Sequence, residues 1–299
     1  MLILTKKFNS CIFAFPVDKT LRQIYNRLRM NVKERALKML NQGFEIVDFH
    51  THPFSIDRFN ICNYHADYDM KEEDVKVDLE SVGISKIAGS VIVYREPVES
   101  FNTVKLCNDE ALAIAKRLDG FYVPGFHIHP SYVEESINEV KRMAAAGVKL
   151  IGELVPYLQG WKTYNEEGLF PILEEAARHS MVVSFHDMAF DTIDEMVERN
   201  PDITFVAAHP GEHNAVLRHI ERMKKYDNVY LDISGTGIFR WHMLKYAVDQ
   251  VGSERILFGS DYPTCNPGVF IGGVLAEPIS DEAKENIFSK NAKRLLGLK

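Results

Sequence analysis

The chain has 299 residues, of which 46% are hydrophobic and 26% are charged, and its formal net charge is −7. This composition is ordinary for a globular protein with a large core, and the acidic balance argues against a duplex-DNA-binding protein, which usually presents a basic surface. No run of eighteen apolar residues is present, so no membrane span is expected.

Two features indicate a cytoplasmic protein. Polar residues such as Lys6 and Lys7 interrupt the apolar N-terminus, and no A-x-A site follows, so no signal peptide is expected. The cysteines are widely spaced and form no C-x-x-C pair, which is typical of reduced thiols rather than of a disulfide framework. They are Cys11, Cys62, Cys107 and Cys265.

Residues 1–43 are predicted to form a helical extension. A capping-box pattern at Thr20 precedes apolar residues at helical spacing from Leu21 to Leu28. A second helical pattern, Val32 to Leu40, ends near Gly43, which is a reasonable helix breaker. The extension could serve packing or subunit contact, so a homo-oligomer is left open.

Between residues 44 and 299, eight short apolar runs alternate with helical patterns. The predicted strands are 44–50, 86–94, 121–128, 148–155, 181–185, 203–208, 229–233 and 256–258. The predicted helices are 70–82, 101–118, 131–146, 165–179, 192–199, 212–225, 241–251 and 280–296, with N-caps at Ser131, Asn165 and Ser280 among them. Eight such alternations over roughly 250 residues predict an α/β fold of the (β/α)₈ TIM-barrel type.

A doubly wound open sheet would alternate in the same way. It usually carries a glycine-rich phosphate loop, and the nearest candidate here, Gly235-Thr236-Gly237, has Arg240 where the third glycine would stand. Strands that are apolar almost throughout also fit a parallel sheet buried on both faces. The barrel is therefore the favoured fold.

Residues of metal-binding types follow five of the predicted strands. His50 and His52 follow the first strand and, two residues apart in extended chain, would point to the same face. Glu153, His186, His209 and Asp261 stand at the ends of the fourth, fifth, sixth and eighth strands. Because the active site of a TIM barrel lies at the C-terminal ends of its strands, these side chains would surround one axis. Imidazoles and carboxylates are common ligands of divalent metals, so the pattern predicts a metal site.

These segments resemble the metal-dependent amidohydrolase superfamily, in particular its amidohydrolase-related branch. The matching pieces are Asp48-Phe49-His50-Thr51-His52, Phe185-His186-Asp187, Ala208-His209-Pro210-Gly211 and Phe258-Gly259-Ser260-Asp261-Tyr262-Pro263. The resemblance implies a distorted (β/α)₈ barrel over residues 44–299. It also implies that His50, His52 and Asp261 hold one divalent metal and that Asp261 is the general base. His186 and His209 would then serve a second metal or the substrate.

Glu153 stands where many members of the superfamily carry a carboxylated lysine, and in this it is similar to the members that use a glutamate. Lys149 precedes it by four residues, roughly 13 Å along a strand, which is too deep for a ligand. We expect Glu153 to bridge two metals. The branch that includes decarboxylases commonly holds one metal, so one or two ions, with Zn²⁺ expected, are left open.

Five further residues are weaker candidates for substrate contact. They are His127, Tyr157, Trp161, His213 and Arg240. His127 belongs to a second His-x-His, Tyr157 and Trp161 follow Glu153 in a loop, and His213 begins a helix after His209. Structural alternatives are no contact at all for His127, packing on the barrel rim for the aromatics, a surface helix position for His213 and a surface salt bridge for Arg240.

We expect a metal-dependent hydrolase that uses metal-activated water on a small-molecule amide, ester or lactone. One alternative is a non-oxidative metal-dependent decarboxylase of the same superfamily, which would need one metal and an arginine that holds a carboxylated substrate. Another is a catalytically silent barrel that binds a metal or a ligand. Neither a nucleic acid nor a membrane is an expected partner.

Overall fold

The computed structural model describes residues 42–56, 71–92, 98, 100–188, 190–237 and 240–299. The helical extension predicted for residues 1–43 falls, except for its last two residues, outside these ranges. Within the described parts, no helix combines the length and the apolar character that a membrane-spanning segment requires.

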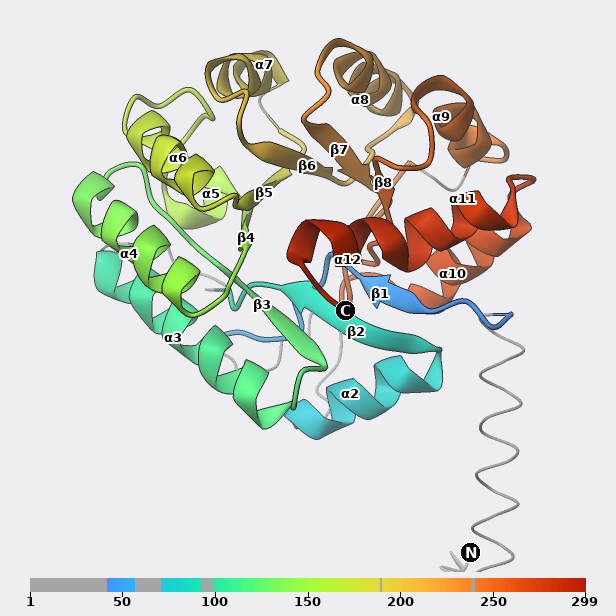
Figure 1. Cartoon of the computed structure of the whole chain (residues 1–299), viewed down its shortest axis with the longest axis horizontal. Helices are drawn as coiled ribbons and strands as arrows, with labels where there is room; N and C mark the ends of the chain where they lie inside the picture. Colours follow the sequence, from blue (N-terminus) through green and yellow to red (C-terminus); the bar gives the residue numbers. More distant parts are fainter. Residues whose placement is uncertain (1–41, 57–70, 93–97, 99, 189, 238–239) are drawn as a thin grey trace, which may run out of the picture. The chain divides into compact units, whose positions relative to one another are not determined.

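Eight parallel strands form one sheet in the order of the chain, as a (β/α)₈ TIM barrel requires (Figure 1). The strands are β1 (Ile46–Asp48), β2 (Ile84–Gly89), β3 (Tyr122–Phe126), β4 (Leu150–Leu154), β5 (Val182–His186), β6 (Thr204–Ala208), β7 (Val229–Asp232) and β8 (Ile256–Leu257). The pairing register shifts between β1 and β2 and again between β4 and β5, so the barrel is irregular at these places.

Helices follow the strands, and most of them lie on the outer side of the sheet (Figure 1). They are α2 (Glu72–Ser81), α3 (Phe101–Arg117), α4 (Val133–Ala145), α5 (Pro156–Gln159), α6 (Leu169–Arg178), α7 (Phe190–Arg199), α8 (His213–Lys225), α9 (Met243–Val251), α10 (Pro267–Ala276), α11 (Asp281–Glu285), the π-helix η1 (Asn286–Lys290) and α12 (Asn291–Leu296). Ser280 caps α11 as predicted, because its hydroxyl accepts a hydrogen bond from the Ala283 N–H.

Two predicted helix starts were wrong. The first residues of α4 and α6 follow Tyr132 and Gly168, and neither Ser131 nor Asn165 caps a helix. The Ser131 N–H instead donates to His129 Nδ1, and the Asn165 amide binds Glu195 and Thr163. Helix α10 was not predicted, because it has no polar side chain and therefore no amphipathic period.

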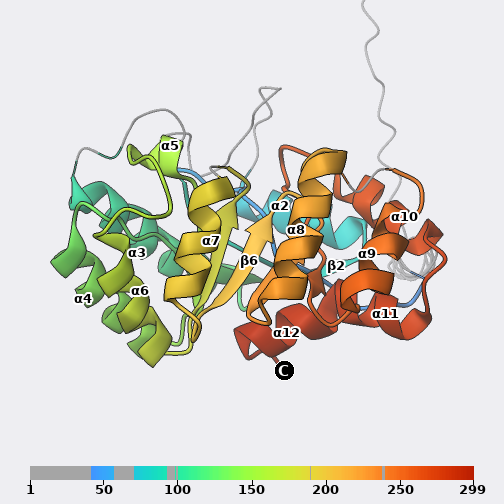
Figure 2. The same ribbon diagram turned by 90° about the horizontal axis from the view of Figure 1, so that it is seen from above.

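An apolar cluster fills the interior of the barrel below the strand ends. Val47, Leu150, Val182, Val206 and Leu257 contribute from five different strands, and Ala292 and Leu296 of α12 complete the cluster. Helix α12 and the short helix α5 lie at opposite ends of the barrel in Figure 2. Lys149 is exposed and lies beside Gly297, at the α12 end, so it is remote from the end that carries the candidate site.

Hydrogen bonds between the segments that follow β1 and β8 join the first and last strands. The Asp261 N–H donates to the His50 carbonyl over 2.9 Å, and the His52 N–H donates to the Tyr262 carbonyl over 2.7 Å. The buried Asp48 carboxylate accepts from both the N–H and the hydroxyl of Ser260. The closure of the barrel therefore sets the spacing of the residues that the sequence marks as metal ligands.

Two glycine substitutions test this packing. A Cβ on Gly89, the last residue of β2, would lie 1.9 Å from the Thr51 carbonyl oxygen, whereas a Cβ on Gly272 of α10 would meet no atom within 4 Å. We expect Gly89→Ala to lower the free energy of unfolding by about 1–3 kcal/mol, since the backbone must move. Gly272→Ala should raise it by about 0.5–1 kcal/mol, because alanine favours a helix interior. Urea denaturation measures both, and equal effects would contradict the packing.

Candidate metal centre

The six predicted ligands come together at the C-terminal end of the barrel. His186 continues the inward face of β5, since it is four residues after Val182 of the interior cluster. Asp261 follows β8, and the hydrogen bond from its N–H to the His50 carbonyl holds it beside the first strand. Strict alternation from Leu150 would turn Glu153 outward, but the register shift in β4 and the left-handed backbone of Gly152 at φ +98° bring it into the site.

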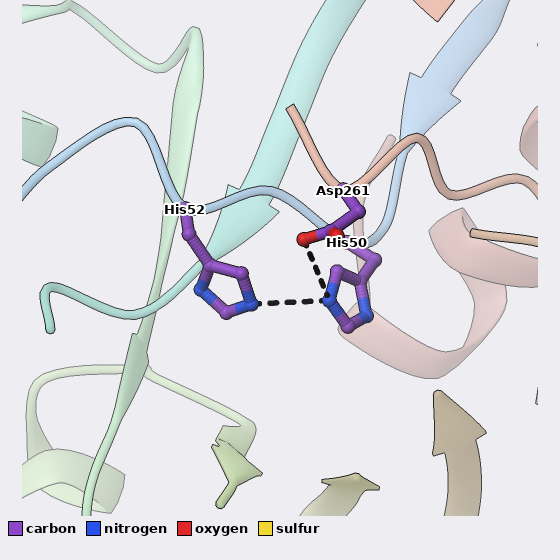
Figure 3. Close-up of side chains that lie close together, drawn as sticks. All are labelled: His50, His52 and Asp261. Carbon is purple, nitrogen blue, oxygen red and sulfur yellow. Dashed lines mark hydrogen bonds and ion pairs between the residues drawn. The ribbon is translucent and has the colours of Figure 1, made fainter. Parts of the chain in front are cut away.

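His50, His52 and Asp261 form one group of metal-binding atoms (Figure 3). The Nε2 atoms of the two histidines are 3.0 Å apart, and His50 Nε2 is 3.7 Å from an Asp261 oxygen. At this distance only one of the two nitrogens can carry a hydrogen, so at least one lone pair faces the other ring. All three side chains are buried or nearly so. The arrangement is that of donors converging on one point.

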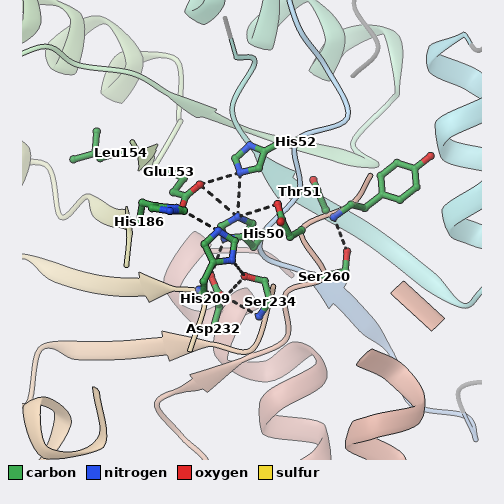
Figure 4. A network of polar contacts seen from close by, with 12 residues as sticks. His50, Thr51, His52, Glu153, Leu154, His186, His209, Asp232, Ser234 and Ser260 are labelled. Atoms are coloured by element: carbon green, nitrogen blue, oxygen red, sulfur yellow. Dashed lines mark hydrogen bonds and ion pairs between the residues drawn. The ribbon is translucent and has the colours of Figure 1, made fainter. Parts of the chain in front are cut away.

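Glu153 divides its two oxygens between two pairs of histidines (Figure 4). Oε2 is 3.1 Å from His52 Nε2 and 3.6 Å from His50 Nε2. Oε1 is 2.8 Å from His186 Nδ1 and 3.3 Å from His209 Nε2. His50, Glu153 and His209 thus form a second group of donors that overlaps the first.

Left-handed backbone conformations hold two of these residues. His209 has φ +62° and Asp261 has φ +59°, and residues other than glycine seldom occupy this left-handed region. Each such residue costs on the order of 1–3 kcal/mol and persists only where its surroundings fix it. Gly235 leaves room for the His209 ring, since a Cβ there would lie 2.4 Å from His209 Nδ1.

Asp232, the last residue of β7, supports the ligands from below and was missed in the sequence. Its Oδ2 accepts from His50 Nδ1 over 2.9 Å, and its Oδ1 accepts from the Ser234 N–H over 2.9 Å. Ser234 Oγ is in turn 3.1 Å from His209 Nδ1. Such contacts fix the ring orientation and leave Nε2 for the metal. Its place near the end of the seventh apolar run, residues 229–233, is the signal in the sequence that indicates it.

The charges of the site favour a cation. Burial alone would lower the pKa of His50, but the Asp232 and Glu153 carboxylates raise that pKa to about 10. Burial would raise the pKa of Glu153, but His50 and His209 hold it well below its ordinary value. Two buried carboxylates are therefore ionised among imidazoles. A divalent ion fits this donor set in both ligand chemistry and charge.

A cavity of about 560 Å³ lies over these residues. His52, Glu153, His186, His209 and Asp261 form its polar floor. Its remaining walls are Ile92, Val155, Tyr157, Leu158 and Thr264. The Tyr157 ring is 57% exposed and lies 5.6 Å, centre to centre, from the His186 ring. Tyr157 is thus the one weak candidate that lines this cavity.

The other weak candidates lie elsewhere. Trp161 is buried in the core, and its indole N–H donates to Gln159 Oε1 over 3.0 Å. His213 is exposed at the start of α8, and Arg240 is exposed and pairs with Glu212. None of these three side chains lines the described cavity, so their contact with a substrate stays a prediction. His127 is buried beside a narrower pocket that adjoins the cavity.

Solved structures similar to this chain share its fold at low sequence identity. 2,6-Dihydroxybenzoate decarboxylase from Rhizobium matches with a TM-score of 0.66 at 15% identity, covering 85% of this chain and 99% of that chain. 5-Carboxyvanillate decarboxylase from Novosphingobium aromaticivorans, with manganese and 4-hydroxy-3-methoxy-5-nitrobenzoic acid, matches with 0.65 at 14%, covering 86% and 97%. An uncharacterized TIM-barrel protein from Bordetella bronchiseptica matches with 0.61 at 18%, covering 85% and 98%.

The sequence itself gives a broader match. No curated protein sequence matches significantly. A family model described as Amidohydrolase, however, matches residues 47–298, which include all six candidate ligands. The family and the two donor groups together support a divalent metal. This chain therefore belongs to the amidohydrolase family.

Proposed function

We propose that this protein is a hydrolase that binds two divalent metal ions and cleaves an amide, ester or lactone bond of a small molecule. One observation carries the proposal: Glu153 presents one oxygen to His50 and His52 and the other to His186 and His209. A carboxylate placed in this way suits a bridge between two ions.

The donors divide into two sets around Glu153. His50, His52 and Asp261 would hold one ion, and His186 and His209 the other. Zn²⁺ is our first choice, because four imidazoles with carboxylates are a donor set that zinc accepts. Mn²⁺ is the second choice, since manganese is present in the decarboxylase from Novosphingobium aromaticivorans.

The chain's own residues perform the proton transfers. A divalent ion held by these donors would supply Lewis acidity, which activates water as a nucleophile and polarises a carbonyl group. Asp261 lies at the cavity floor within reach of His50, so it is placed to accept the proton of the attacking water and return it to the leaving group. Asp232 keeps His50 in one orientation throughout. Tyr157 overhangs the same cavity and is placed to contact the substrate.

Decarboxylation of an aromatic acid is the second candidate, because two of the similar structures are decarboxylases. That reaction calls for a cationic side chain to hold the substrate carboxylate. Among the described residues, no lysine or arginine lines the cavity. Arg58 and Arg95 lie outside the described residues. The described part of the site thus favours hydrolysis.

Metal content tests the bridge. We expect two equivalents of zinc in the wild-type protein and one or none in Glu153→Gln, because the amide cannot supply two anionic oxygens. Plasma emission spectrometry after dialysis against zinc gives the count. Glu175→Gln is the matched control, since Glu175 is as buried as Glu153 but pairs with Arg178 on α6. One equivalent in the wild type, unchanged by Glu153→Gln, would exclude the bridged site.

Product analysis separates the two reactions. We expect the zinc-loaded protein to hydrolyse members of a panel of 4-nitrophenyl esters, anilides and γ-lactones and to release no carbon dioxide from 2,6-dihydroxybenzoate. Asp261→Asn should lower kcat by about 10²–10⁴-fold, because it removes the general base. Carbon dioxide release with no hydrolysis in the panel would support the decarboxylase instead.

Metal affinity should depend on pH through His50. Its raised pKa of about 10 means that the metal-free ring is protonated at neutral pH, and the proton must leave before Nε2 binds metal. We expect the zinc Kd to fall about tenfold for each unit of pH between 7 and 9. Competition with a chelator measures the zinc Kd at each pH, after correction for the pH dependence of the chelator's own affinity for zinc.

Asp232→Asn provides the matching variant. It removes the carboxylate that raises the pKa of His50 and fixes its ring. We expect a 10–100-fold loss of zinc affinity at pH 9 and a shallower pH dependence, since less proton must be displaced. An affinity that is independent of pH in both proteins would rule out a protonated His50 in the metal-free site.

A further inference from the structure

A narrow side pocket adjoins the cavity next to Glu153. Its volume is about 30 Å³, and it shares Ile92, Glu153, Val155 and Leu158 with the cavity. Its remaining walls are Val98, Val104, Cys107, His127 and Gln159. Because Glu153 belongs to both spaces, a group bound in the side pocket would lie next to the candidate metal centre.

Aliphatic side chains form most of this pocket. Val104, on the first turns of α3, is 2% exposed, and Val155 follows β4. Ile92 follows β2, and Leu158 belongs to α5 over the cavity. These walls come from helices α3 and α5 and from the residues that follow β2 and β4, so the aliphatic part of the pocket lies outside the eight strands.

The polar residues at the back of the pocket bind one another. His127 Nε2 donates to the Val91 carbonyl over 2.9 Å, which leaves Nδ1 to accept from the Gln159 amide over 3.1 Å. Gln159 Oε1 accepts from the Trp161 indole over 3.0 Å. Both ring nitrogens of His127 are therefore in use, and the wall offers little hydrogen bonding to a guest.

The pocket also lacks charge for a charged guest. Burial lowers the pKa of His127 to about 4, so the ring is neutral at neutral pH. Glu153 is the single charged residue among the described lining residues, and both of its oxygens face histidines. A carboxylate group placed here would lose its water without gaining a cationic partner among the described lining residues, which is costly.

We propose that this side pocket selects substrates that carry a short, uncharged alkyl group on the carbonyl carbon. This inference rests on the proposed hydrolase function, in which the polarised carbonyl lies beside Glu153. The pocket has room for about two water-sized groups, which corresponds to an ethyl or isopropyl substituent. The substrate class is then the amides and esters of short aliphatic acids.

Alkyl hydroxamates provide a probe of this selection. A hydroxamate binds a divalent ion through its two oxygens and leaves its alkyl group on the carbonyl carbon. We would measure the Kd of acetyl, propionyl, butyryl, isobutyryl, hexanoyl and succinyl hydroxamates for the full-length zinc-loaded protein by calorimetry. Each methylene that enters the pocket should tighten binding about fourfold relative to the acetyl compound. Hexanoyl and succinyl hydroxamates should bind no more tightly than the acetyl compound.

A matched pair of variants locates the effect. Val104→Ala should enlarge the pocket and move the tightest binding to a longer chain, so that butyryl gains at least fourfold over propionyl hydroxamate. Val140→Ala removes the same atoms from α4, where Val140 is fully buried and lines neither space, and should leave the order unchanged.

The outcomes are distinct. The same Kd across the series, tightest binding of the succinyl compound, or an equal response of both valine variants would overturn the side pocket alone. No binding of any hydroxamate to protein that contains zinc would overturn the proposed function and the pocket with it.

Discussion

The site depends on the burial of ionised carboxylates. Glu153 and Asp232 lie inside the barrel, and desolvation of such groups is unfavourable unless cations and hydrogen bonds offset it. Four imidazoles face Glu153, and His50 stands between both carboxylates. In the metal-free protein a proton on His50 supplies part of the missing positive charge. A divalent ion would provide more positive charge at the same place. The burial of two carboxylates therefore favours metal binding.

The contacts that close the barrel also fix the spacing of the candidate ligands. Asp48 of β1 binds Ser260, and the adjoining His50 and Asp261 share a backbone hydrogen bond. The two candidate ligands are thus joined through the seam between the first and last strands. Any opening of this seam would separate them, so the ligands hold their spacing only while the barrel is closed. At the opposite end, Ala292 and Leu296 of α12 complete the interior cluster, which leaves the strand ends as the accessible side.

The order of the strands and the ligand types could be predicted from the sequence, because both depend on local patterns. Eight apolar runs indicated eight parallel strands, and the polar residues after them indicated the site. The positions of Glu153 and His209 could not be derived in this way. A strict two-residue period turns Glu153 outward, and the shift in β4 that corrects it depends on contacts between strands. The left-handed backbone of His209 likewise depends on the room that Gly235 leaves for its ring. The burial of Trp161 depends on such contacts as well, since its partner Gln159 belongs to a helix that the sequence did not indicate.

The floor and the walls of the cavity differ in composition and in how freely their residues can be exchanged. The floor is polar and comes from strand ends, where buried charge restricts each position to a few residue types. The side pocket is lined by valine, isoleucine and leucine from α3, α5 and the residues that follow β2 and β4, and such residues can be exchanged at a modest cost in packing. His127 and Gln159 lie between the two, because their hydrogen bonds hold α5 over the cavity while their remaining surface closes the side pocket. Substitutions in the walls could therefore change which acyl group is accepted and leave the donors of the floor in place.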